Sequence, residues 1–204
     1  RLFQAAKAGH TGTLDPLATG LLPICLGEAT KFSQGLLDSE KTYQAVVKLG
    51  ETTSTGDAEG DILSNQAVDV SRACVVQALS RLLGSVSQIP PMYSALKHRG
   101  KPLYAYAREG IQVDRAPRKV RIESLRLDNI TRQEIKITIH CSKGTYIRVL
   151  AEDLGKTLGC GAYLKALRRT GVGPFRLNQA FTLPQLEAMN LERRDASLLP
   201  VDSL

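Results

Sequence analysis

The chain has 204 residues, of which 43% are hydrophobic, and it carries a formal net charge of +7. This content suits one packed domain and excludes a disordered chain, and no run approaches the ~18 apolar residues of a membrane span. The excess of cations predicts a polyanionic partner, and the start over residues 1–4, which lacks an apolar signal core, predicts a cytoplasmic protein.

The cysteines and histidines offer no metal-binding pattern. The four cysteines are widely spread, and only three histidines are available. Zinc sites need closely spaced pairs of such ligands, so the sequence predicts no metal. Reduced thiols in a cytosolic protein are the plain interpretation.

The first notable segment, residues 9–20, is rich in glycine and contains one acid, Asp15. Its three glycines allow tight turns and close approach to a ligand, and Pro16 biases Asp15 toward an extended conformation. A carboxylate held on such a loop without a local cation is a candidate nucleophile or base. The alternative is a turn whose Asp caps the following helix. A phosphate-binding loop is excluded, because the segment lacks the Gly-Lys-Ser/Thr ending.

A strand and a helix are predicted in the first half of the chain. Alternating Tyr43, Ala45, Val47 and Leu49 indicate a half-buried strand. A helix is predicted from a cap at Ser71 to about residue 83, before Gly84. The side chains predicted on its apolar face are Cys74, Val75, Ala78, Leu79, Leu82 and Leu83.

Residues 91–121 hold most of the net charge. This segment contains eight cations against two acids, and three of the chain's six tyrosines. Cations neutralise phosphates, and aromatic faces stack on unpaired bases. A solvated charged face is the alternative, but the concentration of charge favours contact with nucleic acid. Glycine and proline breaks suggest a mobile element that becomes ordered on its nucleic-acid partner.

The second half of the chain predicts a hairpin and a helix. Glu134 to Cys141 alternates as a half-buried strand, and residues 119–127 are predicted to pair with it through a turn at 128–133. Apolar residues spaced three and four apart predict a helix from Ile147 to near Gly159. Together the elements indicate an α+β domain.

Arg148 falls in the first turn of this last helix. A cation there opposes the helix dipole at a cost of a few tenths of a kcal/mol or more, which a nearby anion would offset. An ordinary surface arginine is the alternative.

Six ordered blocks resemble the motifs of one enzyme family, the TruB family of tRNA pseudouridine synthases, bacterial type. The longest is GHTGTLDPLATGLLPICLGEATK over residues 9–31. The others are KTY at 41–43, TSTGDAEG at 53–60, QIPPMYSA at 88–95, HCSKGTYIR at 140–148 and LRR at 167–169. They cover nearly the whole chain.

The resemblance implies the pseudouridine synthase fold, a mixed and mostly antiparallel sheet with flanking helices and a central cleft. It implies that residues 1–204 form the catalytic domain, without the family's N-terminal strand and C-terminal PUA domain. It also implies that the 91–121 segment is an insertion that grips the tRNA T-arm. A monomer with no membrane attachment, no obligatory protein partner and no cofactor is expected.

The resemblance further implies the site. Asp15, Tyr43 and Arg148 match catalytic residues, with Asp15 and Arg148 paired. Substrate-binding positions match His10, Tyr146, Leu167 and Asp57, although an Asx turn is an equal alternative for Asp57. The cations expected to contact RNA are Lys97, Arg99, Lys101, Arg108, Arg118 and Lys119.

The implied reaction moves the uracil of the T-loop uridine at position 55 from an N1 to a C5 bond with C1′. Detaching a base develops positive charge at C1′, which suits a carboxylate. Attack on C1′, addition to C6 and assistance in removing the 2′ hydrogen all remain open for Asp15. Two other functions are weighed: a non-catalytic RNA-binding module or tRNA chaperone, and a guide-RNA-dependent catalytic subunit.

Overall fold

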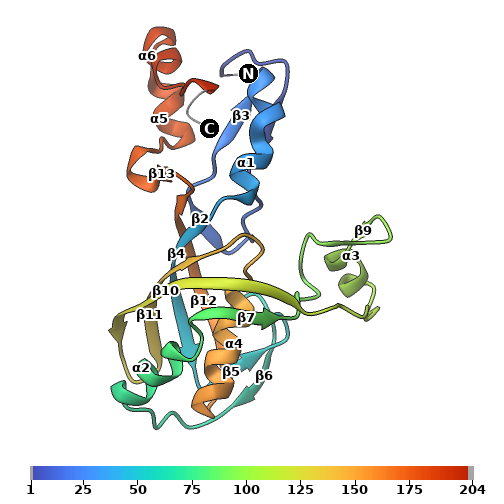
Figure 1. Ribbon diagram of the computed structural model, residues 1–204, viewed down its shortest axis with the longest axis vertical. Coiled ribbons are helices and arrows are strands. Elements are labelled where there is room, and N and C mark those ends of the chain that lie inside the picture. The colour runs from blue at the N-terminus through green and yellow to red at the C-terminus, as the bar shows by residue number, and fades with distance from the viewer. Residues whose placement is uncertain (1, 202–204) are drawn as a thin grey trace.

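The computed structural model describes residues 2–201, and its central feature is a mostly antiparallel sheet of seven strands (Figure 1). The spatial order is β13-β12-β4-β11-β10-β7, with β2 running parallel beside β12. The strands are β2 (Ala18–Gly20), β4 (Lys41–Leu49), β7 (Gly84–Gln88), β10 (Arg118–Ile130), β11 (Glu134–Cys141), β12 (Ala162–Val172) and β13 (Phe175–Arg176). Helices flank the sheet, so the predicted α+β class is confirmed.

The hydrophobic core lies between this sheet and two helices, α2 (Arg72–Ser80) and α4 (Ile147–Leu158). Alternate side chains of the two central strands face it, because residues two apart share one face of a strand. These buried side chains are Ala45, Val47 and Leu49 of β4 and Ile135, Ile137, Ile139 and Cys141 of β11. The predicted alternation is therefore confirmed on both strands.

The predicted hairpin and the last predicted helix are also confirmed. β10 pairs antiparallel with β11, but it extends to Ile130, so the turn is shorter than predicted. α4 begins at Ile147 and ends at Leu158, followed by Gly159 with a φ of 75°. A left-handed residue at this position is the common helix end, and glycine adopts it without strain.

The helix predicted to reach residue 83 ends earlier, at Ser80. Its cap is as predicted, since the Ser71 hydroxyl accepts the Cys74 N–H. Leu82 and Leu83 then form a tighter turn through bonds to carbonyls three residues back. This turn directs Leu83 outward, and Cys74 is exposed as well, so two of the six predicted core positions are wrong.

Shorter elements surround the sheet. They are β1 (Ala8–His10), β3 (Ile24–Leu26), η1 (Gly27–Phe32), α1 (Ser33–Asp38), β5 (Glu51–Thr53), β6 (Ile62–Asn65), η2 (Leu177–Gln179), α5 (Leu183–Ala188) and α6 (Leu191–Ala196). Of these, β3 and α1 lie beside α5 and α6 at one end of the molecule (Figure 1). Arg194 of α6 joins them by donating to the Leu2 carbonyl at 2.9 Å. No helix within residues 2–201 is both long and apolar enough to cross a bilayer.

An arm, residues 89–117, leaves the sheet between β7 and β10 and projects to one side (Figure 1). It contains a hairpin of β8 (Lys97–His98) and β9 (Lys101–Pro102), followed by α3 (Leu103–Arg108). Arg115 holds its two ends together by donating to the Pro90 carbonyl at 3.0 Å. Residues 118–121, assigned from the sequence to the insertion, pair with β7 as the start of β10, so the arm ends before them.

Candidate functional site

Asp15 lies in the loop between β1 and β2. The Ala18 N–H donates to the Asp15 carbonyl at 2.8 Å and closes a turn that holds Pro16 at its second position, where a fixed φ is favoured. Gly12 and Gly20 have φ values of 123° and 109°, which L side chains rarely adopt. Because a turn and then a strand follow Asp15, the alternative of a helix cap is wrong.

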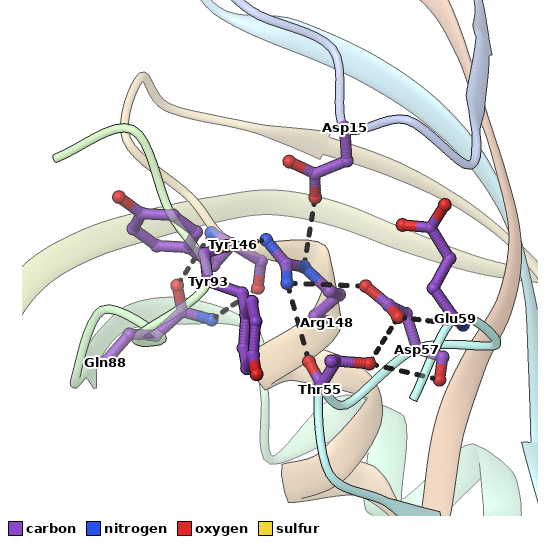
Figure 2. Close-up of polar contacts among 8 residues, drawn as sticks. All are labelled: Asp15, Thr55, Asp57, Glu59, Gln88, Tyr93, Tyr146 and Arg148. Atoms are coloured by element: carbon purple, nitrogen blue, oxygen red, sulfur yellow. Dashed lines mark hydrogen bonds and ion pairs between the residues drawn. The ribbon is translucent and has the colours of Figure 1, made fainter. Parts of the chain in front are cut away.

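The guanidinium of Arg148 faces Asp15 from the first turn of α4 (Figure 2). Its Nε lies 3.0 Å from Asp15 Oδ2, and its Nη1 lies 3.3 Å from Asp57 Oδ2. Nη2 donates to the Tyr93 carbonyl at 2.6 Å, and Nη1 donates to the Thr55 carbonyl at 3.4 Å. The pairing of Asp15 with Arg148 is confirmed. The alternative of a surface arginine is wrong, since Arg148 is only 4% exposed.

Asp57 combines the two interpretations that the sequence left open. Its Oδ1 accepts the N–H of Glu59, two residues on, at 3.1 Å, which is the geometry of an Asx turn, and it also accepts the Thr55 hydroxyl at 2.5 Å. Its other oxygen contacts Arg148, and the residue is buried. The turn therefore fixes a second carboxylate against the same guanidinium (Figure 2).

Burial raises the pKa of Asp15 above its ordinary value. Arg148 acts in the opposite direction, and the negative charge of Asp57 adds to the rise in pKa. The side chain of Asp15 remains 37% exposed, so it is open to an approaching ligand. Arg148 was expected to keep the carboxylate ionised, and it does favour that form, although burial is the larger influence.

Asp15 and its partners line one cavity of about 880 Å³. Tyr43 of β4, Leu167 of β12 and Tyr146, just before α4, line the same cavity. Burial raises the pKa of the Tyr43 hydroxyl, while the neighbouring Arg169 opposes that rise. The cavity therefore combines the Asp15 carboxylate, the Tyr43 phenol and apolar wall residues such as Leu167, a combination that can hold a planar base beside an acid–base group.

The structure brings together six of the residues predicted for the site and leaves the seventh apart. Asp15, Tyr43, Asp57, Tyr146, Arg148 and Leu167 all line the cavity. His10 is exposed on β1, where its Nδ1 accepts the Gly12 N–H at 3.4 Å, and it is not among the cavity-lining residues. Its place is at the base of the Asp15 loop.

The predicted RNA-contacting cations occupy different settings. Arg108 lies over the Tyr104 ring, 5.3 Å from its centroid, and both side chains line the cavity from α3. Lys101 is engaged within the arm, 2.5 Å from Glu109 and 4.7 Å above the Tyr106 ring. The remaining four are exposed and take part in no ion pair found within residues 2–201. They are Lys97 and Arg99 of the arm and Arg118 and Lys119 of β10.

Several buried polar residues near the site were not predicted as functional, and three of them form multiple hydrogen bonds with the backbone. Lys41 donates to the carbonyls of Leu36, Leu37 and Ser39, and Gln88 exchanges two hydrogen bonds with the Tyr146 backbone. The third is Arg169, which contacts the Asp15 loop. Arg169 had a visible signal, because it shares strand parity with buried Leu167 and so puts a charge on an inward position.

Family models match the whole chain. The TruB family pseudouridylate synthase (N terminal domain) model matches residues 1–147, and the tRNA pseudouridylate synthase B C-terminal domain model matches residues 148–204. The proteins named tRNA pseudouridine synthase B from Burkholderia mallei (strain NCTC 10247) and Methylobacillus flagellatus are 58% and 56% identical to it. Each alignment covers 100% of this chain, and 68% and 67% of those proteins respectively.

Solved structures with the same fold are more distant in sequence. The crystal structure of a Cbf5-Nop10-Gar1 complex matches with a TM-score of 0.76 at 27% identity, covering 98% of this chain and 54% of that one. An H/ACA RNP bound to a substrate RNA containing 2′-deoxyuridine matches with a TM-score of 0.68 at 26% identity, covering 96% and 48%. The chain thus spans about half of these structures, and it has the pseudouridine synthase fold. On the family models and the curated relatives, the chain belongs to the TruB family of pseudouridylate synthases, which are isomerases.

Proposed function

We propose that this chain converts the uridine at position 55 of the tRNA T-loop into pseudouridine, acting as a monomer without an obligatory protein partner. The observation that carries the proposal is the ion pair of Asp15 and Arg148 at the cavity, together with membership of the family. The names of the curated relatives support tRNA as the substrate.

Asp15 is the proposed catalytic residue. Breaking the C1′–N1 bond leaves positive charge at C1′, which a carboxylate stabilises or attacks. The base then rotates and forms a bond from C5 to C1′, while the C5 proton is lost to solvent and N1 gains one. No oxidant or cofactor is required, because the product is an isomer of the substrate. Arg148 orients the carboxylate and favours its ionised form.

The cavity is proposed to hold the flipped nucleotide. Its volume of about 880 Å³ lies in the range of small-molecule sites, roughly 300–1,000 Å³. Extruding a base costs a few kcal/mol, and stacking on an aromatic ring offsets part of that cost. Tyr43 supplies such a ring and a hydroxyl for proton transfer, while Tyr146 and Leu167 supply further walls of the cavity. Asp57 acts through Arg148.

The arm and the first residues of β10 are proposed to contact the T-arm backbone. Lys97, Arg99, Arg118 and Lys119 are exposed for phosphate contacts, and Arg108 reaches the cavity itself. Lys101 contributes while it also braces the arm against Glu109. His10, at the base of the Asp15 loop, is proposed to support the rearranged T-loop of the tRNA.

The test measures tritium release from tRNA that carries 5-³H-uridine, followed by mapping of the product position. We expect release from wild-type tRNA and from a bare T-stem-loop transcript, and none when position 55 is changed to cytidine. The likeness to Cbf5 complexes gives a reason to test for guide dependence as well. Turnover only with added guide RNA and partner proteins would favour a guide-dependent catalytic subunit. Binding of tRNA without any release would favour the chaperone alternative.

A further inference from the structure

The side chain of Arg169 is the most deeply buried charge near the site. It points inward from β12 and is 1% exposed. Its Nε donates to the Leu21 carbonyl at 2.8 Å, and its Nη2 donates to the Gly12 carbonyl at 3.1 Å. Its Nη1 contacts the Thr13 carbonyl at 3.5 Å. One guanidinium therefore holds carbonyls on both sides of Asp15 in the chain.

The backbone of Arg169 holds the same loop. Arg169 pairs with Gly20 in the parallel register of β12 and β2, and the Leu21 N–H donates to the Arg169 carbonyl at 2.8 Å. A Cβ at Gly20 would lie only 2.1 Å from that carbonyl oxygen, so the two strands are in close contact. The Asp15 loop is thus fixed to the sheet at its C-terminal end by the backbone of Arg169. The Arg169 side chain also holds its N-terminal end, through the Gly12 carbonyl.

The charge of Arg169 has no acidic partner among the ion pairs of residues 2–201. It lines the cavity with Tyr43, where it opposes the burial that raises the pKa of that hydroxyl. A buried charge is costly unless it is fully hydrogen-bonded, and a leucine would fill the same inward position without that cost. The hydrogen bonds to the loop are what this arginine adds to the fold.

We propose that Arg169 is a positioning residue, which sets the backbone of the Asp15 loop so that the carboxylate meets both Arg148 and the substrate. This inference rests on the proposed function for its kinetic consequence, but its structural half is independent of that function. Arg148 then orients the carboxylate while Arg169 places the loop that carries it.

The test compares Arg169→Lys with Arg194→Lys. Arg194 is a matched control, because it also donates to three carbonyls, those of Leu186, Leu2 and Met189, at the far end of the molecule. Lysine keeps the charge but lacks the planar fork. A misplaced catalytic group costs about 10²-fold, so we expect kcat of Arg169→Lys to fall by about that factor, with KM for tRNA unchanged. The control variant is expected to keep both constants.

Hydrogen exchange supplies a measurement that does not depend on activity. In Arg169→Lys, we expect faster exchange at the amides of Ala18 and Leu21, with unchanged protection in β11. The control variant is expected to change exchange only near α6. If the wild type releases no tritium, the proposed function fails, and the exchange data still decide whether Arg169 holds the loop.

Either of two results would overturn the inference. One is an Arg169→Lys protein with wild-type kcat and an unchanged loop. The other is loss of protection throughout β4 and β11, both in this variant and in the uncharged Arg169→Gln, which would assign Arg169 to the stability of the sheet. A folded Arg169→Gln protein with a mobile loop and reduced kcat would support it.

Discussion

Asp15 is held where its own charge is disfavoured. Burial raises its pKa despite the ion pair with Arg148, so the folded protein binds a proton at Asp15 more tightly than the unfolded chain does. A raised carboxyl pKa means that protonation stabilises the fold, and that this stability is lost as the pH rises through the raised pKa. The proposed chemistry needs the ionised form, so the site is organised at some expense of stability.

Asp57 contributes to the pH at which Asp15 loses its charge, after burial and Arg148. The Asp57 charge raises the pKa of Asp15, and Asp57 also pairs with Arg148. Asp57→Asn removes that negative charge and leaves Arg148 free to act on Asp15 alone, so the pKa of Asp15 should fall. We therefore expect the acid limb of kcat to move to lower pH in this variant. Single-turnover rates across the acidic range measure it, with Asp128→Asn on β10 as the control. A limb that stays in place or moves upward would contradict this account.

Tyr43 is expected to act through its ring and its hydroxyl. Tyr43→Phe keeps the ring, so tRNA affinity should survive while turnover falls by about 10²-fold or more, the usual scale for losing an acid–base group. Tyr43→Leu should also lose the stacking contribution, roughly 1–3 kcal/mol for a base on an aromatic face. Binding titrations and turnover on the same tRNA separate the two roles. A fully active Phe variant would leave stacking as the only role.

Arg148 holds four groups that one ammonium cannot reach together. It contacts the carboxylates of Asp15 and Asp57 and donates to the carbonyls of Thr55 and Tyr93. We expect Arg148→Lys to lower kcat by about 10²-fold, since Asp15 loses its fixed orientation.

Arg126→Lys is the control for that variant. Arg126 also pairs with an aspartate, Asp128 at 2.7 Å, but its side chain is 74% exposed. Its substitution should leave kcat unchanged in the same single-turnover assay. Equal kcat in the Arg148→Lys protein and the wild type would show that the fork of Arg148 is dispensable.

At the scale of elements, regular patterns predicted well and turns did not. β11 and α4 follow from alternation and from three-to-four spacing, because each buries one continuous apolar face. The sequence predicts helix α2 too long, because Leu82 and Leu83 fit the helical period but lie in a tight turn before Gly84. Spacing cannot distinguish a last helical turn from such a turn.

The residues of the site were predicted mainly through the resemblance. Without it, a surface role for Arg148 and a cap at Asp15 were open, since pattern alone does not say which distant segments meet. Strand parity marks Arg169 as an inward charge, but its role was missed because its partners are backbone carbonyls, which no sequence pattern identifies. Only the register of β12 against β2 brings them together.

The arm is expected to contribute RNA affinity rather than core stability. Lys97 and Arg99 lie on its hairpin, where Arg99 has a φ of 49°. Lys97→Gln with Arg99→Asn removes both charges, and asparagine tolerates that conformation. We expect a higher KM for tRNA and a salt dependence shallower by roughly 0.7–0.9 per lost phosphate contact. Lys101 is left intact because it braces the arm.

A double variant outside the arm serves as the control. Lys136→Gln with Arg132→Asn removes the same charge from β11 and its turn, and it should leave the salt slope unchanged. Thermal stability should shift by no more than about 0.5 kcal/mol per substitution in both proteins. Equal loss of affinity in the two would assign RNA binding to overall charge rather than to the arm.

At the scale of the whole molecule, the cavity gathers segments from across the chain. The Asp15 loop, β4, the Asp57 turn, the arm, α4 and β12 all contribute to it. The guanidinium of Arg148, on α4, links three of the other segments directly, because it contacts Asp15, Asp57 and the Tyr93 carbonyl at the base of the arm (Figure 2). The arm and the carboxylate are therefore linked through one side chain.

The central claim is that Asp15 performs the chemistry, and its most direct test is tritium release by Asp15→Asn from a T-stem-loop containing 5-³H-uridine. We expect no turnover, RNA affinity within about an order of magnitude of wild type, and an unfolding temperature at neutral pH that is equal or higher, because asparagine removes a disfavoured charge. Asp128→Asn, from the exposed Asp–Arg pair, should release tritium at the wild-type rate. Release by Asp15→Asn near that rate would contradict the account.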